Sequence, residues 1–136
     1  MSAFSNIPPQ AVLPLGVYDL EELQRNAALA DQRLLRADFD DVHDKTGVLA
    51  RLAGAFGLPA HFGGNLDALY DCITDLKPTD PAEHPGFAVI LQTLPGEPGL
   101  PAADRDALLD VFRDAADFFF DQQIAFRVFY SVRPRA

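Results

Sequence analysis

The stretch Phe87-Ala-Val-Ile-Leu91 is an unbroken run of apolar residues. Strands that alternate apolar and polar residues keep one face in water, whereas strands with continuous apolar runs are covered on both faces, as in parallel sheets packed between helices. Loops rich in Pro and Gly, at residues 77–86 and 94–101, flank this run. The run therefore predicts a central strand of a parallel sheet.

Further elements follow on both sides of this strand. Strands are expected at 34–39 and 124–131, and Pro14 makes the apolar stretch 12–18 at best an edge strand because proline cannot donate to a ladder. Capping residues and helical spacing of apolar residues predict four helices, at 19–30, 44–56, 65–76 and 102–122. Alternating strands and helices predict an α/β fold with a small, mostly parallel sheet of three core strands, flanked by helices.

Length and charge limit the function. We expect the 136 residues to form one domain over residues 12–136, after a loose lead-in at 1–11. The formal net charge of -9 argues against nucleic-acid binding, which needs cations on the protein, and favours a basic partner or simple solubility. Neither a secretory signal nor an apolar run of about 18 residues is visible. We expect a cytoplasmic monomer that does not bind membranes.

The segment from Leu58 to Asp75 divides into two faces when it is placed on a helical wheel. The apolar arc holds Leu66, Leu69, Tyr70, Cys72, Ile73 and Leu76, and the polar arc holds Asp67, Asp71, Thr74 and Asp75. Aspartates four residues apart repel each other. The helix dipole offsets this cost for Asp67 in the first turn but not for Asp71. The stripe is either an ordinary solvated face or a binding surface.

The loop before this helix carries His61 and Phe62, followed by two glycines. Exposed aromatic residues beside charges are typical of protein-binding hot spots. Phe62 also fits a second interpretation, in which its ring folds back into the core.

The pattern Leu-Pro-x-x-Phe-Gly-x-Asn-x-Asp-Ala-Leu-x-Asp-Cys, from Leu58 to Cys72, resembles the signature of the barstar family, whose members are intracellular inhibitors of barnase-type ribonucleases. The order of the flanking elements fits as well. The resemblance covers about residues 34–131 and leaves 12–33 as an N-terminal extension. It implies a barstar-like fold and an antitoxin or immunity function, exerted by blocking a basic ribonuclease.

The resemblance also implies a contact surface. The principal ribonuclease-binding aspartate of the family falls on Asp71, which would occupy the place of an RNA phosphate, and a second interface aspartate falls on Asp67, which would assist it. The long helix would add Asp106. His61 and Tyr70 stand where the type member has other aromatic residues, which leaves the identity of the partner open. The remaining contact positions fall on Phe62, Gly63, Asn65, Leu66 and Thr74.

Other chemistries have weaker support. Cys72 with a histidine would suit a small hydrolase, but its place on the apolar arc predicts a buried, inert thiol. The histidines His43, His61 and His84 lack ligand spacing, so we expect no metal, no cofactor and no enzyme activity. A binding module of the same fold with a partner other than a ribonuclease remains the alternative. Asp110, Asp114, Asp117 and Asp121 of the long helix are interpreted as a solvated face.

Overall fold

The computed structural model describes residues 7–16, 18–59, 64–78 and 85–133. The predicted central run Phe87–Leu91 lies within one strand and is entirely buried. The elements follow in the order β1 (Gln10–Pro14), α1 (Leu20–Leu29), β2 (Arg33–Asp38), α2 (Lys45–Phe56), α3 (Leu66–Thr74), β3 (Gly86–Leu94), α4 (Ala102–Phe120) and β4 (Ala125–Val132).

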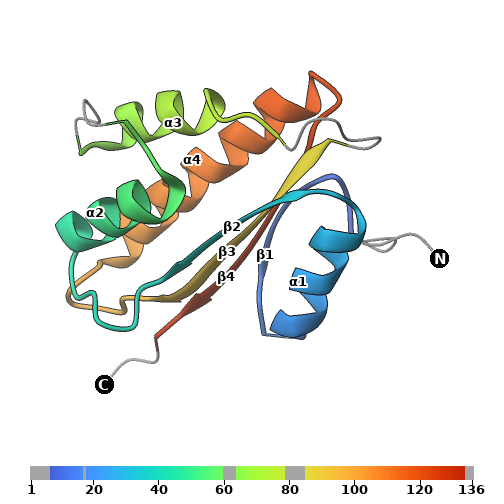
Figure 1. Cartoon of the computed structure of the whole chain (residues 1–136). Helices are drawn as coiled ribbons and strands as arrows, with labels where there is room; N and C mark the ends of the chain where they lie inside the picture. The colour runs from blue at the N-terminus through green and yellow to red at the C-terminus, as the bar shows by residue number, and fades with distance from the viewer. Residues whose placement is uncertain (1–6, 17, 60–63, 79–84, 134–136) are drawn as a thin grey trace.

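The four strands form one parallel sheet in the order β1-β4-β3-β2. The chain first crosses from β1 at one edge of the sheet to β2 at the other edge. It then moves back in the opposite direction, from β2 to β3 and from β3 to β4. Because crossovers between parallel strands are right-handed, the two directions of travel put their helices on opposite faces. Accordingly, α2, α3 and α4 lie on one side of the sheet and α1 on the other (Figure 1). The α/β prediction is confirmed.

The N-terminal strand is an edge strand, as Pro14 predicted, and it pairs with β4. It ends at Pro14, so the expected strand at 12–18 is wrong for Leu15 and Gly16, which follow it as a bend and a turn. It begins at Gln10, inside the segment expected to be a loose lead-in, so that expectation needs correction for residues 10 and 11. Ile7 also packs against the apolar residues under α1. Its carbonyl accepts hydrogen bonds from the guanidinium of Arg127 at 3.3 and 3.2 Å. Pairing of β1 with β4 and the hydrogen bonds from Arg127 explain why this segment is ordered, although its proline-rich composition predicts a loop.

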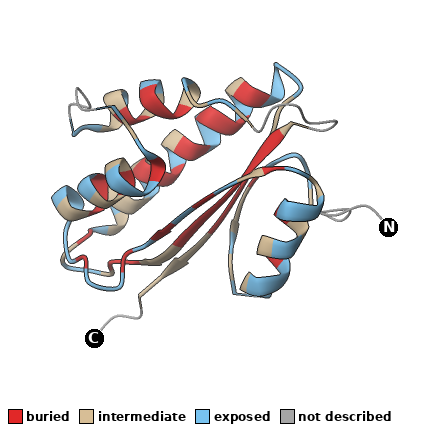
Figure 2. Ribbon diagram, viewed as in Figure 1, coloured by how far each residue is buried: buried red, intermediate tan, exposed pale blue. Residues whose placement is uncertain are grey.

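Two apolar layers hold the sheet between its helices (Figure 2). The larger lies under α2, α3 and α4, where the rings of Phe87, Phe119 and Phe126 pack with centroids 5.0 to 5.7 Å apart. The smaller lies under α1, where Leu23 and Ala27 cover Ala88 and Phe129. Residues before β2 therefore close the second face of the sheet.

Local sequence signals set the helix ends close to their predicted places. Asp44 caps α2 by accepting a hydrogen bond from the Gly47 N–H at 2.7 Å. Gly57 ends α2 with a φ of +64°, a left-handed conformation that glycine adopts without strain. The helices α3 and α4 each stop about two residues earlier than helical spacing predicted.

Replacing Leu23 by alanine tests whether α1 is an integral part of the fold. Leu23 is 3% exposed, so we expect the free energy of unfolding to fall by about 2–5 kcal/mol, as for other buried leucines. The matched control is Leu29→Ala on the same helix, which removes a side chain that is 78% exposed and costs less than about 0.5 kcal/mol. Chemical denaturation measures both, and equal losses would contradict this packing.

A carboxylate-lined groove between α3 and α4

The helix α3 is held at both its start and its inner face. The side-chain oxygen of Asn65 caps it by accepting a hydrogen bond from the Ala68 N–H at 2.8 Å. Gly64, just before the cap, has a φ of +69°, where a side chain would introduce strain. Leu69 and Ile73 are completely buried against the core. These contacts fix the rotation of α3 about its own axis.

The polar arc of α3 consequently faces solvent. Asp67 and Asp71 are exposed, as the wheel predicted. Thr74 is partly buried, and its hydroxyl donates to the carbonyls of Tyr70 at 2.9 Å and Asp71 at 3.2 Å. The Thr74 hydroxyl is thus turned toward its own helix, whereas the two carboxylates point outward.

Some aspartates of the protein have an arginine partner, whereas the α3 carboxylates have none among the described residues. Asp41 pairs with Arg51 at 2.7 Å, and this hydrogen bond lowers the pKa of Asp41. Asp110 pairs with Arg113 at 2.8 Å. Within the part of the chain that the structure describes, neither Asp67 nor Asp71 lies within ion-pair distance of a cationic side chain. Their negative charge is not compensated by the described part of the protein.

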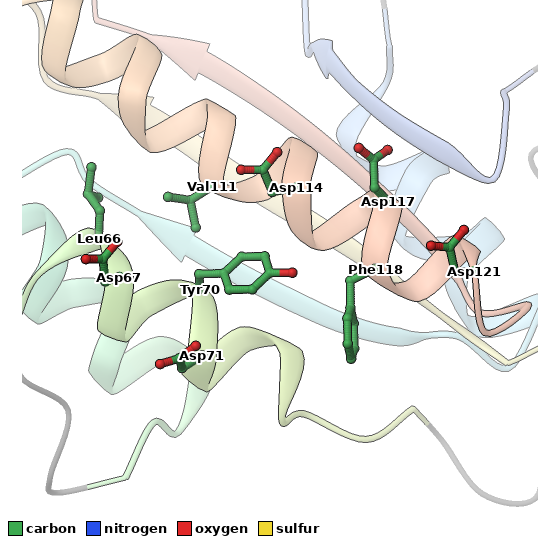
Figure 3. Close-up of a pocket in the computed structure, with 9 residues that line it drawn as sticks. All are labelled: Leu66, Asp67, Tyr70, Asp71, Val111, Asp114, Asp117, Phe118 and Asp121. Atoms are coloured by element: carbon green, nitrogen blue, oxygen red, sulfur yellow. The ribbon is translucent and has the colours of Figure 1, made fainter.

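A groove of about 660 Å³ separates the exposed sides of α3 and α4 (Figure 3). Apolar and aromatic side chains from both helices contribute to its walls, together with carboxylates. Its lining consists of Leu66, Asp67, Tyr70, Asp71, Val111, Asp114, Asp117, Phe118 and Asp121. The groove therefore combines apolar contact area with negative charge.

The structure brings together only some of the predicted contact residues. Leu66, Asp67, Tyr70 and Asp71 line the groove, whereas Asn65 and Thr74 do not. Asp106 also lies outside this lining, and its carboxylate accepts hydrogen bonds from the neighbouring guanidinium of Arg105 at 3.4 Å. His61, Phe62 and Gly63 lie outside the described residues.

Sequence reasoning missed the contribution of α4 to the groove. Asp114, Asp117 and Asp121 follow one another at spacings of three and four residues, which places them on one face of a helix. That spacing was visible, but it is equally typical of a solvated face. Phe118, which also lines the groove, gives no separate signal because the same helix carries several phenylalanines.

Cys72 is 8% exposed, which confirms the predicted buried thiol. Burial raises the pKa of this thiol, and the carboxylates of Asp75 and Asp71 raise it further. A nucleophilic cysteine requires the opposite shift, because the thiolate is the reactive form. The environment of Cys72 therefore disfavours the hydrolase interpretation.

These features define an α/β protein with a preformed acidic groove on the side of the sheet that α2, α3 and α4 cover. None of the described helices combines the length and apolarity needed to cross a membrane. Among curated proteins, none matches the chain. The sequence model of the family described as Barstar (barnase inhibitor) matches residues 32–131, which is most of the chain. The chain belongs to the barstar family, as the signature at Leu58–Cys72 indicated.

The burial of Cys72 predicts slow modification by a thiol reagent such as Ellman's reagent. In the native protein the thiolate forms only at a pH above that of an unfolded cysteine, because the folded state raises the thiol pKa. At mildly alkaline pH we therefore expect the native protein to react much more slowly than the same chain in denaturant. Equal reaction rates would contradict the burial of this side chain.

Proposed function

We propose that the chain inhibits a basic, barnase-type ribonuclease by inserting the acidic face of α3 into the ribonuclease active site. One observation carries the proposal: Asp67 and Asp71 are exposed on a rigid helix, and no described cationic side chain lies within ion-pair distance of them. Membership of a family described as barnase inhibitors supports the same partner class.

The proposed mechanism is electrostatic mimicry of the substrate. A ribonuclease concentrates Arg, Lys and His side chains where the RNA phosphate binds. In this proposal the Asp71 carboxylate occupies that phosphate position, and Asp67 contributes a second charge nearby. RNA is excluded because its phosphate and the carboxylate compete for the same cations. Inhibition of this kind is stoichiometric and needs neither catalysis nor a cofactor.

The rigidity of α3 favours tight binding. Asn65 caps the helix and Leu69 and Ile73 anchor it, so binding need not order this segment. The net charge of -9 also attracts a cationic partner at long range and speeds its association.

We propose that the protein acts as a cytoplasmic monomer.

The rest of the proposed contact surface surrounds these two aspartates. Leu66 and Tyr70 supply apolar area on the groove wall. On α4, Asp114 lines the groove and suits the acidic contact better than Asp106, whose charge is shared with Arg105. His61, Phe62 and Gly63, which precede α3 in sequence, complete the surface in this proposal.

Replacing Asp71 by alanine tests the proposal directly. Losing one partner of a desolvated, hydrogen-bonded charge pair costs about 2 kcal/mol or more, so we expect affinity for a barnase-type ribonuclease to fall at least about 30-fold. Titration calorimetry and ribonuclease inhibition assays measure the change. The matched control, Glu21→Ala, removes the same charge from α1 on the opposite face of the sheet and should bind like the parent.

Two outcomes would overturn this function. If Asp71→Ala bound as tightly as the parent, the assigned role of Asp71 would be wrong. If the parent bound and inhibited no barnase-type ribonuclease even at low ionic strength, the partner would belong to another class of protein. The alternative binding module would then be favoured.

A further inference from the structure

We infer that the part of the groove between Tyr70 and Phe118 is a second binding subsite, which takes an arginine or lysine side chain from a segment outside the partner's active site. The inference rests on the proposed function, because it assigns a second contact to the same partner. It concerns the C-terminal end of α4, where no sequence pattern singled out Phe118 and where Asp117 and Asp121 were interpreted as a solvated face.

The walls of this subsite suit a long cationic side chain. In Figure 3 the ring of Tyr70 extends from α3 toward Phe118 of α4. Both rings are partly exposed, and Phe118 packs edge-on against the buried Phe119 with centroids 5.3 Å apart. Lys and Arg lay their aliphatic stems on apolar surface, and their charged heads are attracted to aromatic faces. Two rings on facing helices offer both contacts.

The negative charge at this end of the groove is spread over separate carboxylates that do not converge on one point. Asp117 and Asp121 are exposed and lie one helical turn apart. No three carboxylates among the described residues come together closely enough to hold a metal ion. Separate carboxylates beside apolar walls fit a cation carried on a carbon chain better than a bare ion. This complementarity is the reason for choosing a basic side chain as the occupant.

The negative charges of these two carboxylates are unfavourably placed in the free protein. Asp117 lies in the last turn of α4 and Asp121 is its C-terminal cap, where the helix dipole disfavours negative charge. The last turn contains no basic residue, and the two aspartates repel each other. Asp117 does accept a hydrogen bond from the side-chain amide of Gln10 on β1, which orients the carboxylate without neutralising it. The uncompensated charge is therefore available to a cationic partner.

A peptide titration tests the subsite without any ribonuclease. The probe is the blocked tripeptide Gly-Arg-Gly, followed by heteronuclear NMR of the full chain. We expect saturable shifts of the Tyr70 and Phe118 ring signals and of the amides at 117–121, and we expect Asp117→Asn/Asp121→Asn to abolish them. The control Glu21→Gln/Glu22→Gln removes the same charge from α1 and should leave them unchanged. No shifts, or equal loss in both variants, would overturn the inference.

Binding to the barnase-type ribonuclease provides the second test. Asp117→Asn/Asp121→Asn should raise the melting temperature of the free protein while weakening the complex about fivefold, whereas a structural role would move both measurements in the same direction. Phe118→Ala should weaken the complex about tenfold. Its control is Phe120→Ala on the same helix, which is 47% exposed, lies outside the groove and should have no effect.

The outcomes separate this inference from the proposed function. If Asp71→Ala abolishes ribonuclease binding while the Asp117, Asp121 and Phe118 variants bind like the parent, the second subsite is wrong and the function stands. If the peptide binds at Tyr70 and Phe118 but the parent binds no ribonuclease, the proposed function fails. Chemical denaturation of Phe118→Ala checks that any loss of affinity comes from the groove and not from unfolding.

Discussion

The packing of α3 on α4 is the constraint on which the acidic site depends. Leu69 and Ile73 are completely buried, and each residue of an α-helix advances the surface by about 100°. Rotating α3 by a single residue would bring an aspartate toward the core and expose a buried leucine or isoleucine. The cost of burying an unpaired carboxylate excludes that arrangement. The same contacts that stabilise the core therefore hold Asp67 and Asp71 in solvent.

The N-terminal extension is connected to this site through the sheet. The family match begins at residue 32, so β1 and α1 lie outside it. Nevertheless α1 covers Ala88 and Phe129, residues of the matched region that form the second face of the sheet. From the edge strand β1, Gln10 reaches Asp117 at the rim of the groove. The extension thus contributes both to the stability of the fold and to the orientation of one carboxylate.

Sequence patterns predicted the elements well because their signals are local. The apolar run Phe87–Leu91, the cap at Asp44 and the glycine at Gly57 each act within a few residues. The two faces of α3 were also predictable, since helical spacing separates Asp71 from Leu69. The groove was not predictable in the same way. Its α4 wall follows α3 by about forty residues in sequence, and only tertiary packing brings the two helices together.

The distribution of compensated and uncompensated carboxylates links the fold to the proposed function. Asp41, Asp106 and Asp110 have arginine partners and lie outside the groove, whereas no such ion pair involves the described aspartates that line it. Concentrating like charges in this way destabilises the free protein through repulsion. A cationic partner relieves that repulsion on binding, so the charge that is unfavourable in isolation contributes to the stability of the complex. Because the carboxylates are exposed, salt screens both effects, and the repulsion in the free protein and the affinity for the partner should decline together as ionic strength rises.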